Sequence, residues 1–353
     1  MTALKDLLVS QIRANGPMTV AEYMAACLMH PEHGYYATRD PLGAAGDFTT
    51  APEMSQMYGE LLGLALAQAW MDQGAPGAVA LAELGPGRGT LMADMLRATK
   101  GVPGFHDALR VNLVETSPAL RQVQAQTVQW PGIQWRESVG DLPNLPLFVV
   151  ANEFFDALPV RQLQRDGDKW RERLVGLEGE TLAIGLSDPK AMALLEHRLE
   201  DTRDGDIVEI SPMGESIAAE IGGRIAQHGG AALIVDYGDW RSLGDTLQAV
   251  KGHEATDPLA EPGLADLTTH VDFEALAQAT PSTYSRLTPQ GVFLERLGIT
   301  ARAQALAQRM EGDALETHIA AHRRLTHPHE MGTLFKVMSF TPDGAAPLPG
   351  LDT

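Results

Sequence analysis

A glycine-rich turn, ELGPGRGT at residues 83–90, connects the apolar run AVALAEL to TLMADMLR, which has the spacing of a helix. Three of its residues lack a Cβ atom and let the backbone approach a ligand closely, namely Gly85, Gly87 and Gly89. The first N–H groups of the following helix have no partner within that helix, so a ligand can use them. The turn therefore suits nucleotide binding, and we expect Pro86 and Thr90 to line the same site.

Two acidic residues, one before this turn and one after the next apolar run, indicate which kind of nucleotide the turn binds. Glu83 precedes the first glycine. A pyrophosphate does not need a carboxylate at this position, whereas the cationic amino-acid end of S-adenosylmethionine (SAM) can bind one. Glu115 ends the next apolar run, LRVNLVE, where a doubly wound sheet places the acid that binds the ribose hydroxyls. The sequence lacks the Lys-Ser/Thr pair of a P-loop, and Thr90 replaces the third glycine of the dinucleotide motif. We therefore expect SAM; a dinucleotide and a turn without ligand are the alternatives.

Polar residues also follow the apolar run LPLFVV, in the segment ANEFFDALP at residues 151–159. Ligands of open α/β sheets lie beyond the carboxyl ends of the strands, so this segment should face the same site. We expect Asn152 to contact the cofactor, and Glu153 and Asp156 to act on the substrate. A carboxylate beside an aromatic ring, here that of Phe154, is typical of a site that binds a cationic or polar group. For Asp156 the alternative is a simple helix cap.

The pattern of apolar residues predicts an α/β protein with a Rossmann-like parallel sheet. Residues 1–76 should form an N-terminal helical extension with an active-site loop, and residues 77–341 the sheet domain. Within that domain we expect an inserted β-meander at about 160–187 and additional C-terminal helices at about 240–330, which would cover the substrate. The run LFKVMSF is expected to close the sheet as an antiparallel strand, and residues 342–353 to form a flexible tail.

Composition excludes several classes of function. A formal net charge of −19 argues against a basic face for nucleic acid. No apolar run approaches the length of a membrane span, and the first residues resemble neither a signal peptide nor a transit peptide. We therefore expect a bacterial cytoplasmic protein without membrane insertion. The single cysteine, Cys27, excludes an internal disulfide and is expected to be buried. We expect no metal, although His318 and His322 have the spacing of a helical pair.

Several long segments resemble the MidA family of SAM-dependent methyltransferases, whose mitochondrial members are assembly factors of respiratory complex I and act on protein arginine. The resemblance covers nearly the whole chain. It is carried by GDFTTAPEMSQMYGE at 46–60, ELGPGRGTLMADMLR at 83–97, VETSPALR at 114–121, ANEFFDALPVRQ at 151–162, ALIVDYG at 232–238, DTLQAVKGHEATDPLAEPGLADLTTHVDF at 245–273, and GTLFKV at 332–337.

This resemblance implies a class I methyltransferase sheet and symmetric dimethylation of an arginine, with the large catalytic subunit of complex I as the substrate. Carboxylates would orient the guanidinium and accept a proton from it. We expect Glu153 in this role, with Asp156 or Asp47 as its partner. Phe48 and Thr49 would enclose the methyl group, Phe154 would contact the substrate, and His270 would line the entrance of the acceptor or hold its loop.

Two other functions are compatible with the same residues. One is methylation of a different acceptor, such as a small molecule, and the other is a chaperone that binds SAM without catalysis. The shape of the acceptor cleft would separate the first of these from a protein methyltransferase. The oligomeric state stays open.

Overall fold

The computed structural model describes residues 2–38 and 50–352 of the 353 in the chain. The chain folds into two compact units. The first, which we call the sheet unit, comprises Thr49–Phe155, Glu215–Gly238 and Leu276–Thr353. The second, the meander unit, comprises Met1–Phe48, Asp156–Gly214 and Asp239–Ala275. Each is described separately.

The sheet unit is organised around a sheet with the strand order β15-β17-β10-β5-β2-β3-β4. Strands β4, β3, β2, β5 and β10 are parallel, whereas β17 pairs antiparallel with β10, as predicted for LFKVMSF. The strands are β2 (Val79–Leu84), β3 (Leu109–Val114), β4 (Gln134–Arg136), β5 (Leu147–Asn152), β10 (Gly230–Asp239), β15 (Thr283–Tyr284), β16 (Thr288–Pro289) and β17 (Phe335–Thr341).

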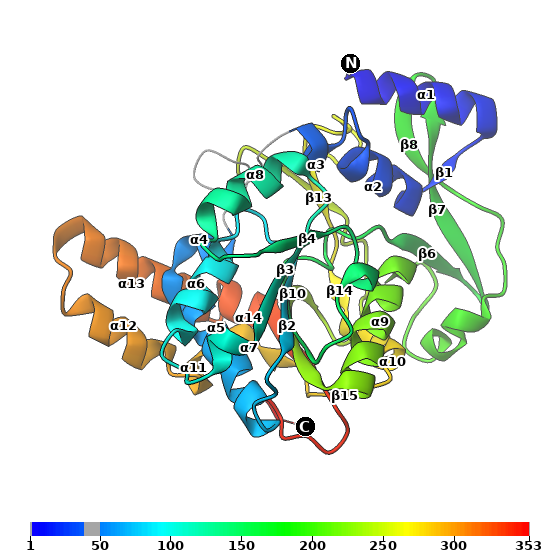
Figure 1. The fold of residues 1–353 in the computed structure, drawn as a ribbon. Helices are drawn as coiled ribbons and strands as arrows, with labels where there is room; N and C mark the ends of the chain where they lie inside the picture. Colours follow the sequence, from blue (N-terminus) through cyan, green and yellow to red (C-terminus); the bar gives the residue numbers. More distant parts are fainter. Residues whose placement is uncertain (1, 39–49, 353) are drawn as a thin grey trace. The chain divides into compact units, whose positions relative to one another are not determined.

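Helices cover both faces of this sheet. Figure 1 shows α5 and α6 on one side of the strands and α9 on the other. All residues of β2 and β5 are buried, as expected for central strands of a parallel sheet that is covered on both faces. The helices are α4 (Ala51–Met54), α5 (Gln56–Asp72), α6 (Thr90–Thr99), α7 (Phe105–Ala108), α8 (Pro118–Thr127), the short 3₁₀ helix η1 (Val139–Asp141), α9 (Pro212–His228), α10 (Phe273–Ala279), α11 (Gln290–Arg296), α12 (Ile299–Ala307), α13 (Gly312–Thr326) and α14 (Met331–Leu334).

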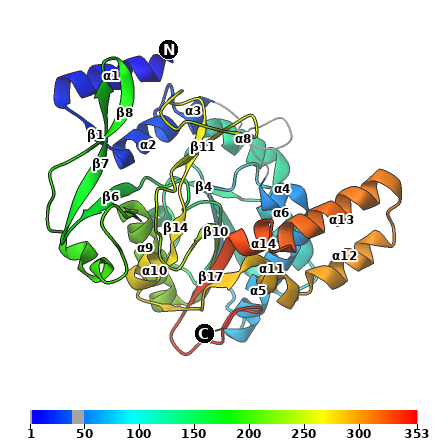
Figure 2. The same cartoon turned by 180° about the vertical axis from the view of Figure 1, so that it is seen from behind.

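Helices α12 and α13 form a hairpin that extends from this unit, as Figure 2 shows. Its first helix is tied to α5 and α6 by a buried carboxylate. Glu60, which is 3% exposed, accepts hydrogen bonds at 2.7 Å from Arg302 of α12 and at 2.7 Å from Arg97 of α6. The hairpin is therefore anchored at its base by charge-assisted hydrogen bonds.

The meander unit contains the predicted β-meander. Strands β6 (Arg161–Asp166), β7 (Lys169–Glu178) and β8 (Thr181–Leu186) pair antiparallel through two-residue turns at 167–168 and 179–180, so the meander is confirmed. The other elements are α1 (Ala3–Asn15), β1 (Met18–Thr19), α2 (Val20–Met29), α3 (Tyr35–Thr38), the 3₁₀ helix η2 (Ala193–Leu199), β9 (Ile207–Ile210), β11 (Gln248–Lys251), β12 (Glu254–Thr256), β13 (Asp266–Thr268) and β14 (Val271–Asp272).

The structure divides the predicted N-terminal extension between the two units. Helices α1 and α2 bury Leu8 and Tyr23 in one core with Val175 of β7. Helix α5 instead buries Leu62 and Leu66 in the core of the sheet unit. The helical periodicity of residues 1–76 is therefore correct, but it contains no information on which core each apolar face joins.

Two other regions differ from expectation. Residues 248–268, expected to be helical, form β11, β12 and β13. The hairpin turn between β11 and β12 consists of Gly252 and His253, both with positive φ (60° and 65°), as in a type I′ turn. Residues after 341, expected to be flexible, pack against the sheet unit, with Leu348 and Leu351 buried and Asp352 paired with Arg296 at 2.9 Å.

Candidate functional site

The glycine turn follows β2 and leads directly into α6. Gly85 and Gly89 have positive φ angles of 59° and 85°, which side chains rarely adopt. A Cβ atom at Gly85 would lie 3.0 Å from Cδ2 of Phe154, and one at Gly89 would lie 2.8 Å from Cγ2 of Val128. The turn therefore requires glycine for its conformation and for its close contacts, and it presents backbone at the carboxyl end of the sheet.

Glu83 lies in β2 directly before this turn and is 3% exposed. Burial raises the pKa of its carboxyl group well above the usual value, and a hydrogen bond to the backbone of Met92 in α6 lowers it only in part. Within the described residues, its Oε2 atom is buried and has no hydrogen-bond partner. A buried carboxylate oxygen without a donor favours a ligand that brings a cationic N–H group. Glu83 thus fits the amino-acid end of SAM.

Glu115 follows β3 at the same edge of the sheet. Its Oε1 atom accepts a hydrogen bond from the backbone N–H of Ser117 at 2.8 Å, and Oε2 accepts one from Nε2 of Gln124 at 3.2 Å. Burial raises the pKa of this carboxyl group, while these donors act in the opposite direction. A carboxylate held in this way at a strand end suits the binding of ribose hydroxyls.

The end of β5 positions Asn152 and Glu153. The hydroxyl of Tyr58 donates to Oδ1 of Asn152 at 2.5 Å, and Nδ2 of Asn152 donates to Oε1 of Glu153 at 3.0 Å. The backbone N–H of Ala51 donates to the same Glu153 oxygen at 3.3 Å. Asn152, predicted to contact the cofactor, therefore uses its side chain to orient Glu153.

Glu153 has a left-handed backbone with φ 51°, an unusual conformation for a residue other than glycine. Asp236 of β10 stabilises the turn that follows, because its Oδ2 atom accepts the backbone N–H groups of Phe154 at 3.2 Å and of Phe155 at 2.9 Å. Strained backbone at such a position is typical of functional sites. Asp236 lies in the block ALIVDYG, but its role in this turn could not be predicted from the sequence, because Phe154 and Phe155 lie more than 80 residues away.

We expect Asp236→Asn to destabilise the protein and to lower its activity. An asparagine side chain cannot accept from both Phe154 and Phe155 while also accepting from Tyr237, which donates to Oδ1 at 3.0 Å. The free energy of unfolding should fall by about 1–3 kcal/mol, the cost of leaving a buried donor unsatisfied. Denaturant unfolding and turnover measure the two effects. The exposed Asp239, changed to Asn, is the matched control, and equal stability of both variants would contradict the assigned role.

The other predicted residues of the sheet unit lie close to the glycine turn. The ring of Phe154 lies beside Gly85 and packs edge to face against Phe155, with ring centroids 5.4 Å apart. The hydroxyl of Thr90 donates to Oε1 of Glu53 at 2.5 Å, and the carbonyl of Pro86 accepts from the N–H of Gly89 at 2.7 Å. These contacts shape the turn.

Asp156 and His270 belong to the meander unit. The carbonyl oxygen of Asp156 accepts from the backbone N–H of Thr269 at 2.9 Å, and His270 donates its backbone N–H to Oγ1 of Thr246 at 2.8 Å. No helix lies between Asp156 and β6, so the alternative role of Asp156 as a helix cap is excluded. Asp47, Phe48 and Thr49 lie outside the described residues.

Three other sequence expectations concern histidine, cysteine and membrane insertion. His318 lies 3.0 Å from the carbonyl oxygen of Ala303, and His322 lies 3.0 Å from Oγ1 of Thr300, so this pair contacts α12. Cys27 is buried as predicted, and burial raises the pKa of its thiol to about 11. Over the ranges that the structure describes, every helix is too short or too polar to cross a membrane.

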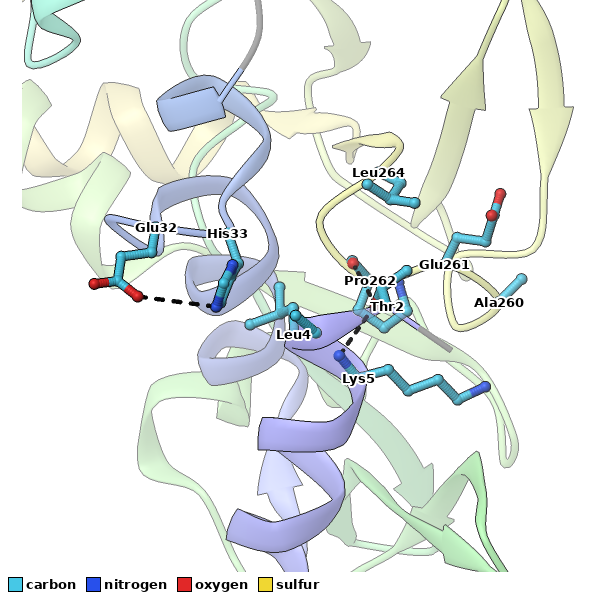
Figure 3. A pocket seen from close by; sticks show the side chains of 10 residues that line it. Thr2, Leu4, Lys5, Glu32, His33, Ala260, Glu261, Pro262 and Leu264 are labelled. Atoms are coloured by element: carbon cyan, nitrogen blue, oxygen red, sulfur yellow. Dashed lines mark hydrogen bonds and ion pairs between the residues drawn. The ribbon is translucent and has the colours of Figure 1, made fainter.

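A pocket of about 740 Å³ lies in the meander unit. Figure 3 shows its lining, which includes Lys5 of α1, His33 and Glu261. Positive and negative side chains are mixed in this lining, and it contains none of the predicted site residues. The pocket therefore gives no support to the predicted chemistry.

The parallel sheet, its glycine turn and the acids at its strand ends define a Rossmann-like nucleotide-binding protein. A family model described as "Putative S-adenosyl-L-methionine-dependent methyltransferase" matches residues 61–292. A crystal structure of a Burkholderia thailandensis protein with bound S-adenosylhomocysteine has a TM-score of 0.84 and 28% identity, and the alignment covers 99% of this chain and 94% of that one. The chain belongs to this family of SAM-dependent methyltransferases.

Curated relatives extend over nearly the whole chain. Mitochondrial protein arginine methyltransferase NDUFAF7 from Danio rerio is 39% identical, with 94% of this chain and 85% of the relative covered. The proteins of the same name from Xenopus laevis and Homo sapiens are each 36% identical, covering 96% and 97% of this chain and 84% of each relative.

These relatives contradict the cytoplasmic location that we expected, because all three are mitochondrial by name. Targeting segments are recognised separately from the folded domain. The expectation rested on the first residues and on the lack of a long apolar run, neither of which indicates the compartment of a folded domain, and it was wrong for this reason.

Proposed function

We propose that the protein transfers methyl groups from SAM to an arginine of a protein substrate, with symmetric dimethylation of the large catalytic subunit of respiratory complex I in support of its assembly. The names of the relatives support arginine as the acceptor. The observation that carries the cofactor assignment is the buried Glu83 oxygen, which has no donor in the part of the chain that the structure describes and lies beside a turn that requires glycine.

The residues that would hold SAM lie at the ends of two neighbouring strands, β2 and β3. Glu83 would bind the amino-acid end, the glycine turn would accept the nucleoside against its backbone, and Glu115 would bind the ribose hydroxyls. Bound SAM supplies an electrophilic methyl carbon, so that an N–C bond forms as the C–S bond breaks. Both acids are buried, which strengthens their interactions with a ligand.

Glu153 would act on the acceptor. A guanidinium group is protonated at physiological pH, so it must be oriented and must lose a proton as the new bond forms. Asn152 and Ala51 both donate to Oε1 of Glu153, which fixes the orientation of the carboxylate before the substrate binds. A carboxylate oriented in this way can accept guanidinium N–H groups and then the proton. Asp156 and Asp47 remain proposed partners in this role.

The test is to incubate the purified protein with SAM and the purified large catalytic subunit, and to identify methylated residues by mass spectrometry. We expect symmetric dimethylarginine in the subunit. Methylation of small metabolites alone would show a different acceptor. SAM binding without any methylation would favour a chaperone that is not an enzyme.

A further inference from the structure

Helix α8 carries a buried amide, Gln124, that contacts both the glycine turn and the acid after β3. Nε2 of Gln124 donates to the carbonyl oxygen of Gly87 at 2.8 Å and to Oε2 of Glu115 at 3.2 Å. Its Oε1 atom accepts from the indole N–H of Trp135 at 2.9 Å. Because the indole is only a donor, these three bonds are compatible with a single orientation of the amide. Both its hydrogens and its oxygen are thus in use.

The same helix packs directly against the turn. A Cβ atom at Gly89 would lie 3.5 Å from Cα and Cγ of Gln124 and 2.8 Å from Cγ2 of Val128, the C-cap of α8. Gln124 is 0% exposed, and the structure allows it little freedom to move. The distance between the turn and the acid is therefore set by a rigid contact rather than by a surface side chain.

Gln124 also completes the positioning of Glu115. Ser117 donates to one oxygen of that carboxylate and Gln124 to the other. Because both oxygens are held by hydrogen bonds, the carboxylate does not have to be reoriented when a ligand binds. This reduces the entropic cost of binding. This role of Gln124 is hard to predict from the sequence, because Gln124 lies on the buried face of α8, four residues after Leu120, where an apolar residue is usual.

We propose that Gln124 is a positioning residue for the cofactor, which holds the Gly87 carbonyl and the Glu115 carboxylate in the geometry that binds the nucleoside of SAM. This inference rests on the proposed function, since it assumes that Glu115 binds the ribose. Gln124 acts through its two partners.

The experiment is calorimetric titration of the full chain with SAM and with S-adenosylhomocysteine, for the wild type and for Gln124→Leu. Loss of the hydrogen bonds to Gly87 and Glu115 should weaken both ligands by about 10- to 100-fold. Gln126→Leu is the matched control, because Gln126 is an exposed glutamine on the same helix, and its affinities should stay within about twofold of the wild type. If Gln124→Leu does not fold, Gln124→Met offers an unbranched side chain of similar length.

The pH dependence of binding separates positioning from a general loss of stability. The folded-state pKa of Glu115 is already raised by burial, and Gln124 is one of the groups that lower it. Removing this donor raises the pKa further, so the carboxylate becomes protonated, and SAM affinity is lost, at a higher pH than in the wild type. A variant that only loosened the fold would show the wild-type pH profile.

In a Glu115→Gln background, the change Gln124→Met should weaken SAM binding less than it does in the wild type, because one of its two partners is already altered. Unchanged affinity in both Gln124 variants, or weaker binding with an unshifted pH profile, would contradict the role of Gln124 but not the proposed function. A wild-type protein that binds no SAM would overturn the proposed function as well.

Discussion

Glu153→Gln should reduce the rate of methylation by about 10²- to 10⁴-fold, the usual contribution of a positioned acid or base. Glutamine has the same size and keeps an oxygen that can accept from Asn152 and Ala51, so the turn should retain its shape. It lacks the negative charge needed to orient a guanidinium and to accept its proton. SAM affinity should change by less than about twofold, because Glu83 and Glu115 are untouched.

Single-turnover kinetics and calorimetry measure these two quantities. Glu137→Gln is the matched control, since Glu137 is an exposed glutamate of the same unit. Asp156→Asn provides the comparison between the two candidate carboxylates, and the larger loss identifies the one that acts on the acceptor. Turnover of Glu153→Gln within about twofold of the wild type would remove Glu153 from the mechanism.

Gly85→Val should abolish SAM binding, with a loss in affinity of about 100-fold or more. Valine is branched at Cβ and adopts φ near +59° only with strain of about 1–3 kcal/mol. Its Cβ atom would also lie 3.0 Å from the ring of Phe154, so the turn and the ring would have to separate. Each 1.4 kcal/mol of this cost weakens binding tenfold if the turn must be restored before SAM binds.

Gly101→Val is the control for this substitution, because a Cβ atom at Gly101 meets nothing within 4 Å. Thermal unfolding of both variants shows whether the fold is retained. Saturable binding by the wild type and its loss in Gly85→Val alone would establish the cofactor site at this turn. Equal affinity of Gly85→Val and wild type would place the cofactor elsewhere.

Local features of the amino-acid sequence were enough to predict the parallel strands of the sheet, its antiparallel closing strand, the β-meander and the glycine turn, but not the short strands β15 and β16. These features depend on the period of apolar residues and on turn residues, which act over a few positions. The rule that ligands lie beyond the carboxyl ends of parallel strands also identified Glu83, Glu115 and Glu153 as candidates, because parallel strands bring these ends to one edge of the sheet.

Contacts between distant segments were decided by tertiary packing. Tyr58 and Asn152 are 94 residues apart, and Gln124 is 37 residues from Gly87. The same packing leaves one oxygen of Glu83 buried without a donor among the described residues, and it assigns α1 and α5 to different cores. Periodicity shows that a face is buried but not what it is buried against. The sequence thus located the candidate site, whereas the fold determined which side chains position its acids.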